Sequence, residues 1–557
     1  MKVTIFFFIF FLLYGGLSMK GQSPMMVKDI RVGPLASNPY NLVEVGNLVF
    51  FIAETAAHGR EVWRSDGTAA GTMMVKDIDP VNNVYHYPES LTAMGNNLYF
   101  VTEDGVHGEE LWKTDGTTAG TVMVKDINPS TTGVVDGVRG YKASLTVMGN
   151  TLYFIANNGV NGDELWKTDG TTAGTVMVKD INSNNANNNY YPRNLTIFNN
   201  ELYFSAENNH STGVELWKTD GTTAGTVMIH DYTPGIYASS SPSNFVVVNN
   251  ELFFTILDGS SGYELWKTNG TAAGSSFMQS LGNNNLSIHF HAVINNSFIY
   301  VHDDGVHGDE LWKSDGTVAG TMMIKDINPN GDGATVNGFT PLILRGNTLY
   351  FVGNDDVHGE ELWKTDGTTA GTMMVKDLSP GSSDGYPWDM YEFNGLLYFS
   401  AYVGNNGREL WQSDGTATGT VMVIDLYPGV GQSYPNHGSP RHFCEMGNEL
   451  YFSANNGVHG TELWKYDPPI YTSQKDIEVT QIPVEVYPNP TSTTLTIKLP
   501  KETLATTTSL YNNLGQLVLS QPFQEQLNVE HLPQGIYQLV LSNKEKALAQ
   551  EKIVIHK

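Results

Sequence analysis

The chain has 557 residues, of which 31 are Lys or Arg and 58 are Asp or Glu, so its formal net charge is −27 at pH 7. This excess of acidic groups repels nucleic acid and anionic membrane surfaces, and we exclude both as partners. The one cysteine, Cys444, cannot form an internal disulfide, so packing must stabilise the fold, and we expect Cys444 to be a buried apolar residue.

A secretory signal peptide is predicted at residues 1–21. Lys2 gives a basic start, Ile5–Leu17 is an apolar run too short to span a membrane, and small residues around Gly16 and Gly21 offer cleavage sites. The mature chain has no other segment that is long and apolar enough to cross a membrane. We therefore expect the protein outside the cytoplasm.

Nine copies of one short motif lie within residues 22–467. The commonest form is ELWKTDGT, and its tryptophans, from Trp63 to Trp464, lie 46 to 54 residues apart. A fixed period near this length is typical of solenoids, propellers and other repeat arrays. We expect the Trp and Leu side chains in the core and the Glu as a partner of the Lys in the recurring VMVKDI segment. A catalytic role for these glutamates is the alternative, although chemistry is usually found at one place on a repeated frame.

Each repeat predicts four short strands. In the third copy, Leu145–Asn150, Thr151–Ala156, Glu164–Thr168 and Val176–Ile181 are apolar, aromatic or β-branched runs separated by Gly, Asn and Asp. Four antiparallel strands in about 50 residues match one blade of a kelch-like β-propeller. The sequence therefore predicts an all-β fold with about nine four-stranded blades.

The two ends of the array predict a closed ring. An isolated copy of the last strand lies at Met25–Ile30, and the ninth repeat stops after its third strand, at Trp464. Pairing these segments would complete the ninth blade and hide two strand edges. The fifth repeat, in which NGTAAGSSFMQSL replaces the usual sequence, is expected to be irregular.

One face of this ring is expected to bind a ligand. Loops from second to third strands share that face with the loops between blades, and both kinds of loop vary among the repeats. Aromatic side chains beside amides suit sugars, which present CH faces and hydroxyls together. The expected ligand-binding residues are Trp388, Tyr386, Tyr87, Tyr191, His58, His107, His307, His358 and His459. The alternative is that the aromatic residues cover the blade ends.

No catalytic residue, metal site or cofactor is predicted. Residues 326–332 match the opening of a calcium loop, but its twelfth position is Asn337 instead of Glu. Turn chemistry is therefore the preferred interpretation, and calcium binding is the alternative. The five loop histidines are dispersed around the ring and cannot meet at one zinc ion.

The composition changes after Trp464. A polar linker is predicted at residues 468–482, and residues 483–557 alternate at the period of strands, as in a small Ig-like β-sandwich. This last segment carries YPNP, an NxxGQ turn, LPxGxY and, at its end, KIVIxK. The residues of these motifs are Tyr487, Pro488, Asn489, Pro490, Gly515, Gly535, Tyr537 and Lys552.

In order and spacing, the four motifs resemble the type A C-terminal sorting domain of the type IX secretion system. The resemblance implies a Gram-negative bacterium, export by the signal peptide, and recognition of residues 483–557 by the type IX machinery at the outer membrane. It also implies a protein that is secreted or held on the outer cell surface. The array is similar to the ELWxxDGT-repeat family, for which the resemblance implies no defined activity.

These observations favour an extracellular binding module for a glycan or another surface ligand over an enzyme. One alternative is an exported polysaccharide hydrolase or lyase with a carboxylate pair at the channel mouth. Another is a structural adhesion component. Saturable binding without turnover would indicate the binding module, and release of a product would indicate the enzyme. Neither result would indicate the structural component.

Overall fold

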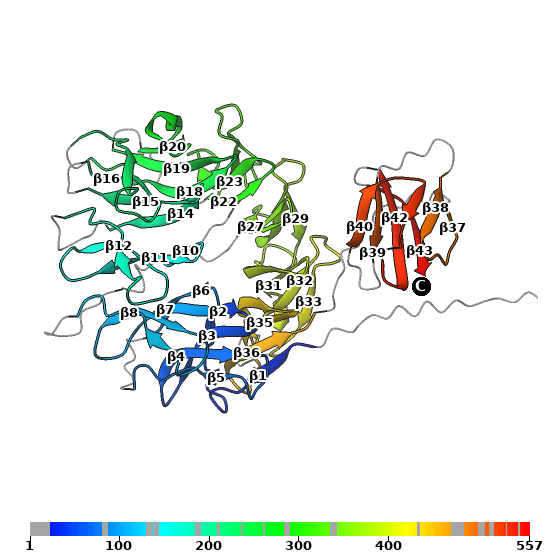
Figure 1. The fold of residues 1–557 in the computed structure, drawn as a ribbon, viewed down its shortest axis with the longest axis horizontal. Coiled ribbons are helices and arrows are strands. Elements are labelled where there is room, and N and C mark those ends of the chain that lie inside the picture. The colour runs from blue at the N-terminus through cyan, green and yellow to red at the C-terminus, as the bar shows by residue number, and fades with distance from the viewer. Residues whose placement is uncertain are drawn as a thin grey trace, which may run out of the picture. The chain divides into compact units, whose positions relative to one another are not determined.

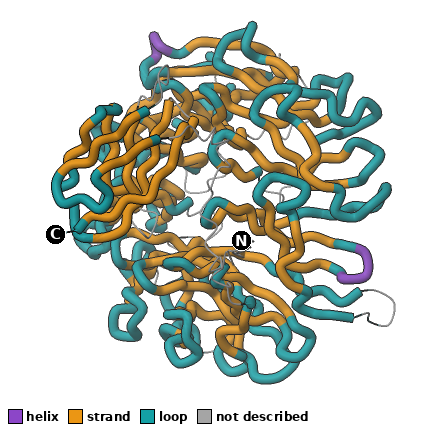
Figure 2. Tube along the Cα trace, turned by 90° about the vertical axis from the view of Figure 1, so that its right-hand side faces the viewer, coloured by secondary structure: helices purple, strands orange, loops and turns teal. Residues whose placement is uncertain are grey.

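The computed structural model describes residues 23–80, 87–129, 138, 144–183, 191–208, 212–235, 238–259, 262–282, 290–334, 342–429, 431, 435–468, 484–499, 507–511, 517–530, 532–543 and 546–556. The chain divides into two compact units, Met1–Pro469 and Ile470–Lys557. Both are built from strands and loops, as predicted, with single 3-10 turns η1 (Ala272–Gly274) and η2 (Gly404–Asn406) in the first (Figure 2). No helix in this described part could cross a membrane.

Nine four-stranded antiparallel sheets make up the described part of the first unit. Their first strands are β2 (Tyr40–Val45), β6 (Glu89–Met94), β10 (Thr146–Met148), β14 (Arg193–Phe198), β18 (Ser243–Val248), β22 (Phe290–Ile294), β26 (Ile343–Arg345), β30 (Trp388–Phe393) and β34 (Arg441–Met446). The second strands are β3 (Leu48–Thr55), β7 (Asn97–Glu103), β11 (Thr151–Asn157), β15 (Glu201–Glu207), β19 (Glu251–Asp258), β23 (Ser297–Asp303), β27 (Thr348–Asn354), β31 (Leu396–Tyr402) and β35 (Glu449–Asn455).

The repeated ELW motif forms the third strand of every sheet. These strands are β4 (Gly59–Ser65), β8 (Glu109–Thr114), β12 (Asp163–Thr168), β16 (Val214–Thr219), β20 (Gly262–Thr268), β24 (Asp309–Ser314), β28 (Glu360–Thr365), β32 (Arg408–Ser413) and β36 (Thr461–Tyr466). The fourth strands are β5 (Met73–Met74), β9 (Val122–Met123), β13 (Val176–Met177), β17 (Val227–His230), β21 (Ser276–Gly282), β25 (Met322–Met323), β29 (Met373–Lys376), β33 (Val421–Ile424) and, from the N-terminus, β1 (Met25–Lys28).

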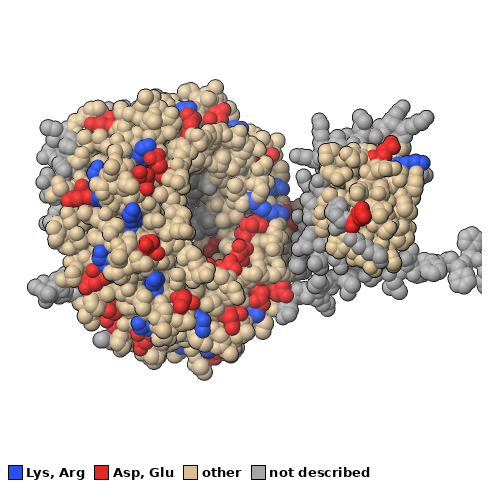
Figure 3. Space-filling view, in the orientation of Figure 1, with Lys and Arg blue, Asp and Glu red and all other residues tan. Residues whose placement is uncertain are grey.

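The predicted closure through the N-terminal strand is confirmed. Strand β1 pairs antiparallel with β36, with Met25 opposite Lys465 and Met26 opposite Trp464. In Figure 1 the sheets follow one another in chain order around a ring, and the blue β1 lies beside β36. The ring surrounds a hollow that opens on the face seen in Figure 3, where acidic side chains line part of the edge.

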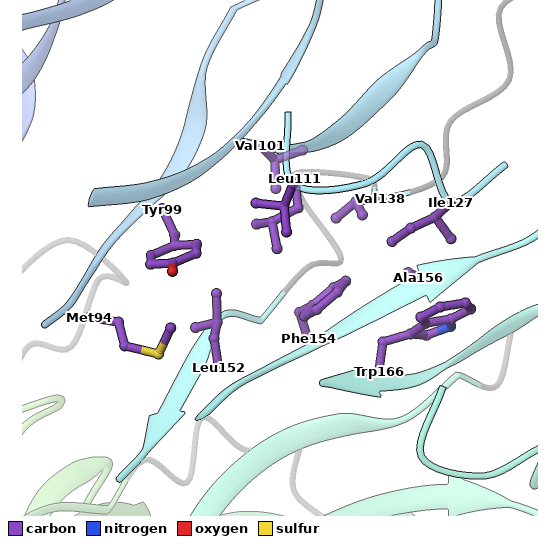
Figure 4. Packing of buried hydrophobic residues seen from close by; sticks show 11 residues of the cluster. Met94, Tyr99, Val101, Leu111, Ile127, Val138, Leu152, Phe154, Ala156 and Trp166 are labelled. Carbon is purple, nitrogen blue, oxygen red and sulfur yellow. The ribbon is translucent and has the colours of Figure 1, made fainter. Parts of the chain in front are cut away.

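The core of the first unit lies between the sheets. Nine clusters of buried residues occur in the described part of the ring, one between each pair of neighbouring sheets, including the ninth and first. Figure 4 shows the cluster in which Leu111 of the second sheet faces Phe154 and Trp166 of the third. The Leu and Trp of each ELW motif therefore pack on opposite neighbours, as expected from strand alternation. Burying each such side chain contributes about 1.5–3 kcal/mol.

The repeated glutamates bind loops instead of lysines. Oε1 of Glu61 accepts hydrogen bonds from the backbone N–H groups of Ile78 (3.0 Å) and Asp79 (3.2 Å), where the fourth strand ends. The Lys76 side chain reaches the next sheet, where Nζ donates to the Thr121 carbonyl at 3.0 Å. The expected Glu–Lys partnership is wrong, because the carboxylate lies buried under its own loop and the long lysine side chain points away from it.

The predicted irregularity of the fifth repeat is confirmed. Its glutamate, Glu264, is only half-buried and accepts a hydrogen bond from Nε1 of Trp266 at 2.9 Å, and within the part of the chain that the structure describes no loop backbone N–H donates to it. Its fourth strand, β21, is the longest of the nine at 7 residues. The change of sequence after Asn269 therefore accompanies a different described partner for this carboxylate than in the other repeats.

The second unit contains two sheets that share one buried core. One sheet is β37 (Glu485–Tyr487), β38 (Thr494–Lys498) and β41 (Gln526–Asn528), and the other is β40 (Leu517–Pro522), β39 (Thr507–Tyr511), β42 (Gly535–Asn543) and β43 (Lys546–Ile555).

The YPNP segment of this unit binds its last strand. The side chain of Asn489 donates to the Lys552 carbonyl at 2.7 Å and accepts from the Val554 N–H at 2.8 Å. The Tyr537 hydroxyl donates to the Pro533 carbonyl at 2.8 Å. Two motifs far apart in sequence are thus joined, whereas Gly515 lies outside the described residues.

Candidate ligand-binding site

The five loop histidines have local partners. Nδ1 of His107, His307 and His358 lies 2.8 Å from the carboxylate three residues before it. His58 lies 2.9 Å from Asp77, and His459 lies 3.1 Å from the Asn456 amide. The hydrogen bonds that these rings donate to Asp304 and Asp355 raise the pKa values of His307 and His358. These contacts support turns, and the described residues contain no group of three or more potential ligands placed to hold a metal ion.

The segment that matches a calcium loop also makes turn and loop contacts. Glu310 accepts from the backbone N–H groups of Ile327 and Asn328, and the Asp332 side chain accepts from the Asp309 N–H at 2.9 Å. Asn337, the residue at the twelfth position, lies outside the described residues.

A repeated bulge shapes the start of the first strands. In six of them one residue has φ between 52° and 59° just where the pairing register shifts. Such bulges redirect the neighbouring side chains and are common beside binding sites. We call the residues immediately before the left-handed ones the rim residues: Tyr40, Glu89, Arg193, Ser243, Trp388 and Arg441. The bulged backbone recurs in these six sheets, whereas the side chain of the rim residue varies. Only the fourth and ninth of these sheets share one, which is arginine.

Trp388 lines a cavity between the eighth and ninth sheets. This Trp388 cavity has a volume of about 460 Å³ and is bounded by Trp388, Asp389, Ser400, Arg408, Ser439, Pro440, Arg441 and His442. The indole is 44% exposed, and Cζ of Arg408 lies 5.2 Å from its ring centroid. Stacking of a guanidinium on an indole holds both groups in one orientation.

Arg408 is fixed by its backbone surroundings. Its Nη1 donates to the Tyr386 carbonyl at 2.9 Å, and its own N–H donates to Nδ1 of His437 at 3.0 Å. Tyr386 is 45% exposed and has φ of 43°, and its hydrogen bond to Asp384 raises its pKa. Tyr386 therefore contributes to this cavity through its backbone, which orients Arg408.

A second cavity continues the site towards the first sheet. This Tyr40 cavity has a volume of about 390 Å³ and is lined by Asn38, Pro39, Tyr40, Glu54, Arg60, Tyr87, Arg441, His442, Ser453 and Thr461. Cζ of Arg60 lies 5.2 Å from the Tyr87 ring centroid, which repeats the Arg408–Trp388 arrangement. Because Arg441 and His442 line both cavities, the two form one continuous region over the eighth, ninth and first sheets.

The polar groups of this region are partly buried and lie close to one another. The backbone N–H of His442 donates to the Asp389 carboxylate, and burial lowers the pKa of the His442 side chain. Burial, followed by the nearby positive charge of Arg441, lowers the pKa of Arg408. Arg408 and Arg441 both line the Trp388 cavity, so its surface carries two guanidinium groups.

The remaining predicted residue lies elsewhere. Tyr191 packs against the cluster between the third and fourth sheets and stacks with Arg193, whose Cζ is 4.2 Å from its ring centroid. Trp388 lines the first cavity, Tyr87 lines the second, and Tyr386 touches the first only through its carbonyl, which binds Arg408. Tyr191 and the five loop histidines line neither cavity.

Sequence reasoning missed Arg60, Arg408, Arg441, His442 and Tyr40. Arg60 and Arg408 had a signal, since they immediately precede the repeated Glu, where the other sheets have acidic, apolar or neutral residues.

A third cavity lies at the irregular fifth sheet. It has a volume of about 630 Å³ and is lined by Tyr232, Thr233, Pro234, Ala238, Ser239, Asp258, Gly259 and Glu264. The half-buried Glu264 carboxylate therefore faces an open space. It accepts from Trp266 Nε1, as described above.

The comparison with protein families identifies the second unit. The family described as "Secretion system C-terminal sorting domain" matches residues 485–556. This tail indicates export by the type IX secretion system, to the cell surface or into the medium. A comparison with curated proteins finds no significant match.

Several solved structures are distantly similar. They include a puromycin hydrolase (12% identity over 66% of this chain and 58% of that chain, TM-score 0.35) and PorZ, a surface component of the type IX secretion system of Porphyromonas gingivalis (11%, 93% and 75%, 0.34). A third is the β-propeller domain of the Trilobed protease from Pyrococcus furiosus (11%, 61% and 98%, 0.31). This chain thus spans 58% of the hydrolase, and similarity at these TM-scores assigns no function.

Proposed function

We propose that the protein is a type IX cargo that binds an extracellular glycan through the Trp388 cavity. In this proposal the nine sheets are the blades of a closed, kelch-like propeller, and residues 1–21 are a signal peptide that is removed. Residues 468–482 form the linker, and residues 483–557 are read by the secretion machinery. The match of the sorting family to residues 485–556 supports the export route.

The exposure of Trp388 carries the binding proposal. Seven of the nine repeated tryptophans are 5–8% exposed, because they fill the spaces between sheets, whereas Trp388 is 44% exposed. It is also the one tryptophan of ten outside the ELW position. An exposed indole over a cavity of about 460 Å³ offers a flat apolar surface beside hydrogen-bonding groups. That combination suits a sugar ring, whose CH face packs on an aromatic ring.

The rigidity of the surroundings supports a preformed site. Trp388 begins β30 and pairs with Ser400 of β31, and Arg408 begins β32. A site built on strands loses little conformational entropy when a ligand binds, in contrast to a site built on long loops.

The proposal is tested by glycan-array binding and calorimetry on the purified mature chain, with and without calcium. Replacing Trp388 by Ala should weaken binding by about 1–3 kcal/mol and leave the melting temperature unchanged, because the indole packs on the ligand and not in the core. Trp388→Phe should retain part of the affinity. Tyr191→Ala serves as the matched control on another sheet and should not weaken binding.

Three outcomes would contradict the proposal. Undiminished affinity in the Trp388→Ala variant would place the ligand elsewhere, and a large loss of stability would make Trp388 a cover for the blade ends. Release of a product from the bound glycan would favour the hydrolase or lyase alternative. Absence of binding to any glycan would favour a structural adhesion role.

A further inference from the structure

Two arginines of the Trp388 cavity have no acidic partner. Among the residues that the structure describes, the Arg408 guanidinium donates only to the Tyr386 carbonyl and the Ser400 hydroxyl, and no ion pair or hydrogen bond of the Arg441 side chain is present. By contrast, Arg31 and Arg60 both reach the carboxylate of Glu54, at 3.1 Å and 3.7 Å.

This arrangement is unexpected in so acidic a protein. Residues 1–21 contribute +2 and residues 475–557 contribute −1 to the net charge of −27, which leaves −28 for the repeat region. Acidic side chains are therefore plentiful, yet Arg408 and Arg441 line one cavity and, among the described residues, neither forms an ion pair. Two guanidinium groups that line one cavity without a described ion pair offer positive charge and N–H donors to an external anion.

The one carboxylate that lines the Trp388 cavity is already engaged. Asp389 has φ of 53° in the bulge and accepts the backbone N–H of His442. Three glutamates of the same sheets, Glu44, Glu392 and Glu445, lie further along their strands. Four residues of strand separate Arg441 from Glu445, about 13 Å, so these carboxylates lie well away from Arg441 along the strand.

We propose that the Trp388 cavity binds an acidic sugar unit of a polysaccharide, with the anionic group held by Arg441 and Arg408 and the ring packed on Trp388. This inference rests on the proposed glycan-binding function and names its ligand class. A planar guanidinium fork matches both a carboxylate and a sulfate ester, and such charge-assisted hydrogen bonds are about twice as strong as neutral ones.

The second cavity extends the inference from one sugar to a chain. Arg60 stacks on Tyr87 at 5.2 Å in the Tyr40 cavity, as Arg408 stacks on Trp388 in the first. Arg441 lies between the two arginine–aromatic pairs, because it lines both cavities. Because Arg60 is paired with Glu54, which lines the same cavity, the Tyr40 cavity offers a ring and hydrogen-bonding groups to a neighbouring sugar unit, while the anionic group is held in the Trp388 cavity.

Calorimetry of the mature chain with alginate, polygalacturonate, dextran sulfate and neutral dextran tests this inference. We expect an acidic polymer to bind and dextran not to bind, with affinity that falls as NaCl is raised from about 0.05 to about 0.5 M. The Arg441→Gln variant should bind about tenfold more weakly, because one charge-assisted contact is lost. Preference for alginate and polygalacturonate would indicate carboxylate recognition, and preference for dextran sulfate would indicate sulfate recognition.

Arg193→Gln is the matched control. Arg193 is the rim residue of the fourth sheet, so it has the same bulge and the same charge change without a second arginine beside it. Its variant should bind as the wild type does. Equal losses in the two variants would show a diffuse charge effect and overturn the inference.

The inference and the proposed function can fail separately. Trp388-dependent binding of a neutral glycan, unaffected by Arg441→Gln, would refute the acidic ligand and keep the glycan-binding function. Absence of binding to every polymer would refute both. The melting temperature of Arg441→Gln should equal that of the wild type, because the Arg441 side chain is exposed.

Discussion

The fourth sheet and the ninth sheet have the same bulged backbone at their first strand, but the side chains there have different surroundings. Both begin with an arginine followed by a left-handed residue, at φ of 59° in Asn194 and in His442. In the fourth sheet Arg193 lies over Tyr191, which packs against the core. In the ninth sheet Arg441 lines two cavities, one shared with the eighth sheet and one with the first. A repeated frame thus determines where a side chain lies, and its neighbours decide whether a site forms.

Removing strand β1 should produce the largest effect on this frame. A chain that begins at residue 31 loses the pairing with β36, the buried Val27 and the backbone N–H that Ile30 donates to Glu462. We expect a loss of about 5 kcal/mol or more of unfolding free energy, because an edge and a buried carboxylate are exposed together. Chemical denaturation measures it, with a chain that begins at residue 23 as the control. Equal midpoints for the two chains would show that β1 does not close the ring.

The sheets, their core and the closure of the ring were predictable from the sequence because the same local pattern of residues occurs nine times. The period of the tryptophans, the alternation of apolar residues and the isolated Met25–Ile30 segment led directly to sheets, core and closure. The glutamate partner was not predictable, since the backbone N–H groups that it binds belong to a loop about 17 residues further on, whose path depends on the folded sheet.

Replacing a core tryptophan and replacing the cavity tryptophan should have very different effects on stability. Trp411 is buried between the seventh and eighth sheets, so Trp411→Ala should cost about 3–5 kcal/mol of stability through the cavity that it leaves. Trp388→Ala should change stability by less than about 0.5 kcal/mol. Thermal denaturation of both variants checks this difference. Similar losses would show that Trp388 belongs to the core.

A smaller effect on stability is expected when the pH changes the ionisation of the buried, repeated glutamates. Burial raises the pKa of Glu310 from 4.5 to about 7, and its Oε2 is buried with no hydrogen-bond partner. Because the folded-state pKa is the higher one, the stability contributed by the neutral acid is complete below about pH 4.5 and is lost as the pH rises through about 7. Between about pH 5 and about pH 8, the wild type should lose about 1–3 kcal/mol more than the Glu310→Gln variant.

Denaturation midpoints measured at both pH values test this expectation. The matched control is Glu264→Gln in the irregular fifth sheet, where the carboxylate is only half-buried and accepts from Trp266 Nε1, so the pH dependence should stay as in the wild type. A wild type that gains stability towards pH 8 relative to Glu310→Gln would mean that the carboxylate is stabilised by its N–H donors.

The site was only partly predictable. Trp388 stood out because it departs from the repeat, and the structure confirms that it is exposed. Arg441 and His442 gave no signal, because their role arises from a bulge that brings three sheets to one region. The loop histidines were grouped by sequence position, yet the rings of His107, His307, His358 and His459 each bind a residue three positions earlier in their own turn, and short-range hydrogen bonds of this kind compete effectively with long-range ones.

A crystal structure of the mature chain with a bound acidic oligosaccharide tests most directly whether function lies in the non-repeated region of the ring. Electron density for a sugar ring against Trp388, with its anionic group within hydrogen-bonding distance of the Arg441 guanidinium, is the expected result. Density confined to the second to fifth sheets, or a ring against Trp388 whose charge points away from both arginines, would contradict it.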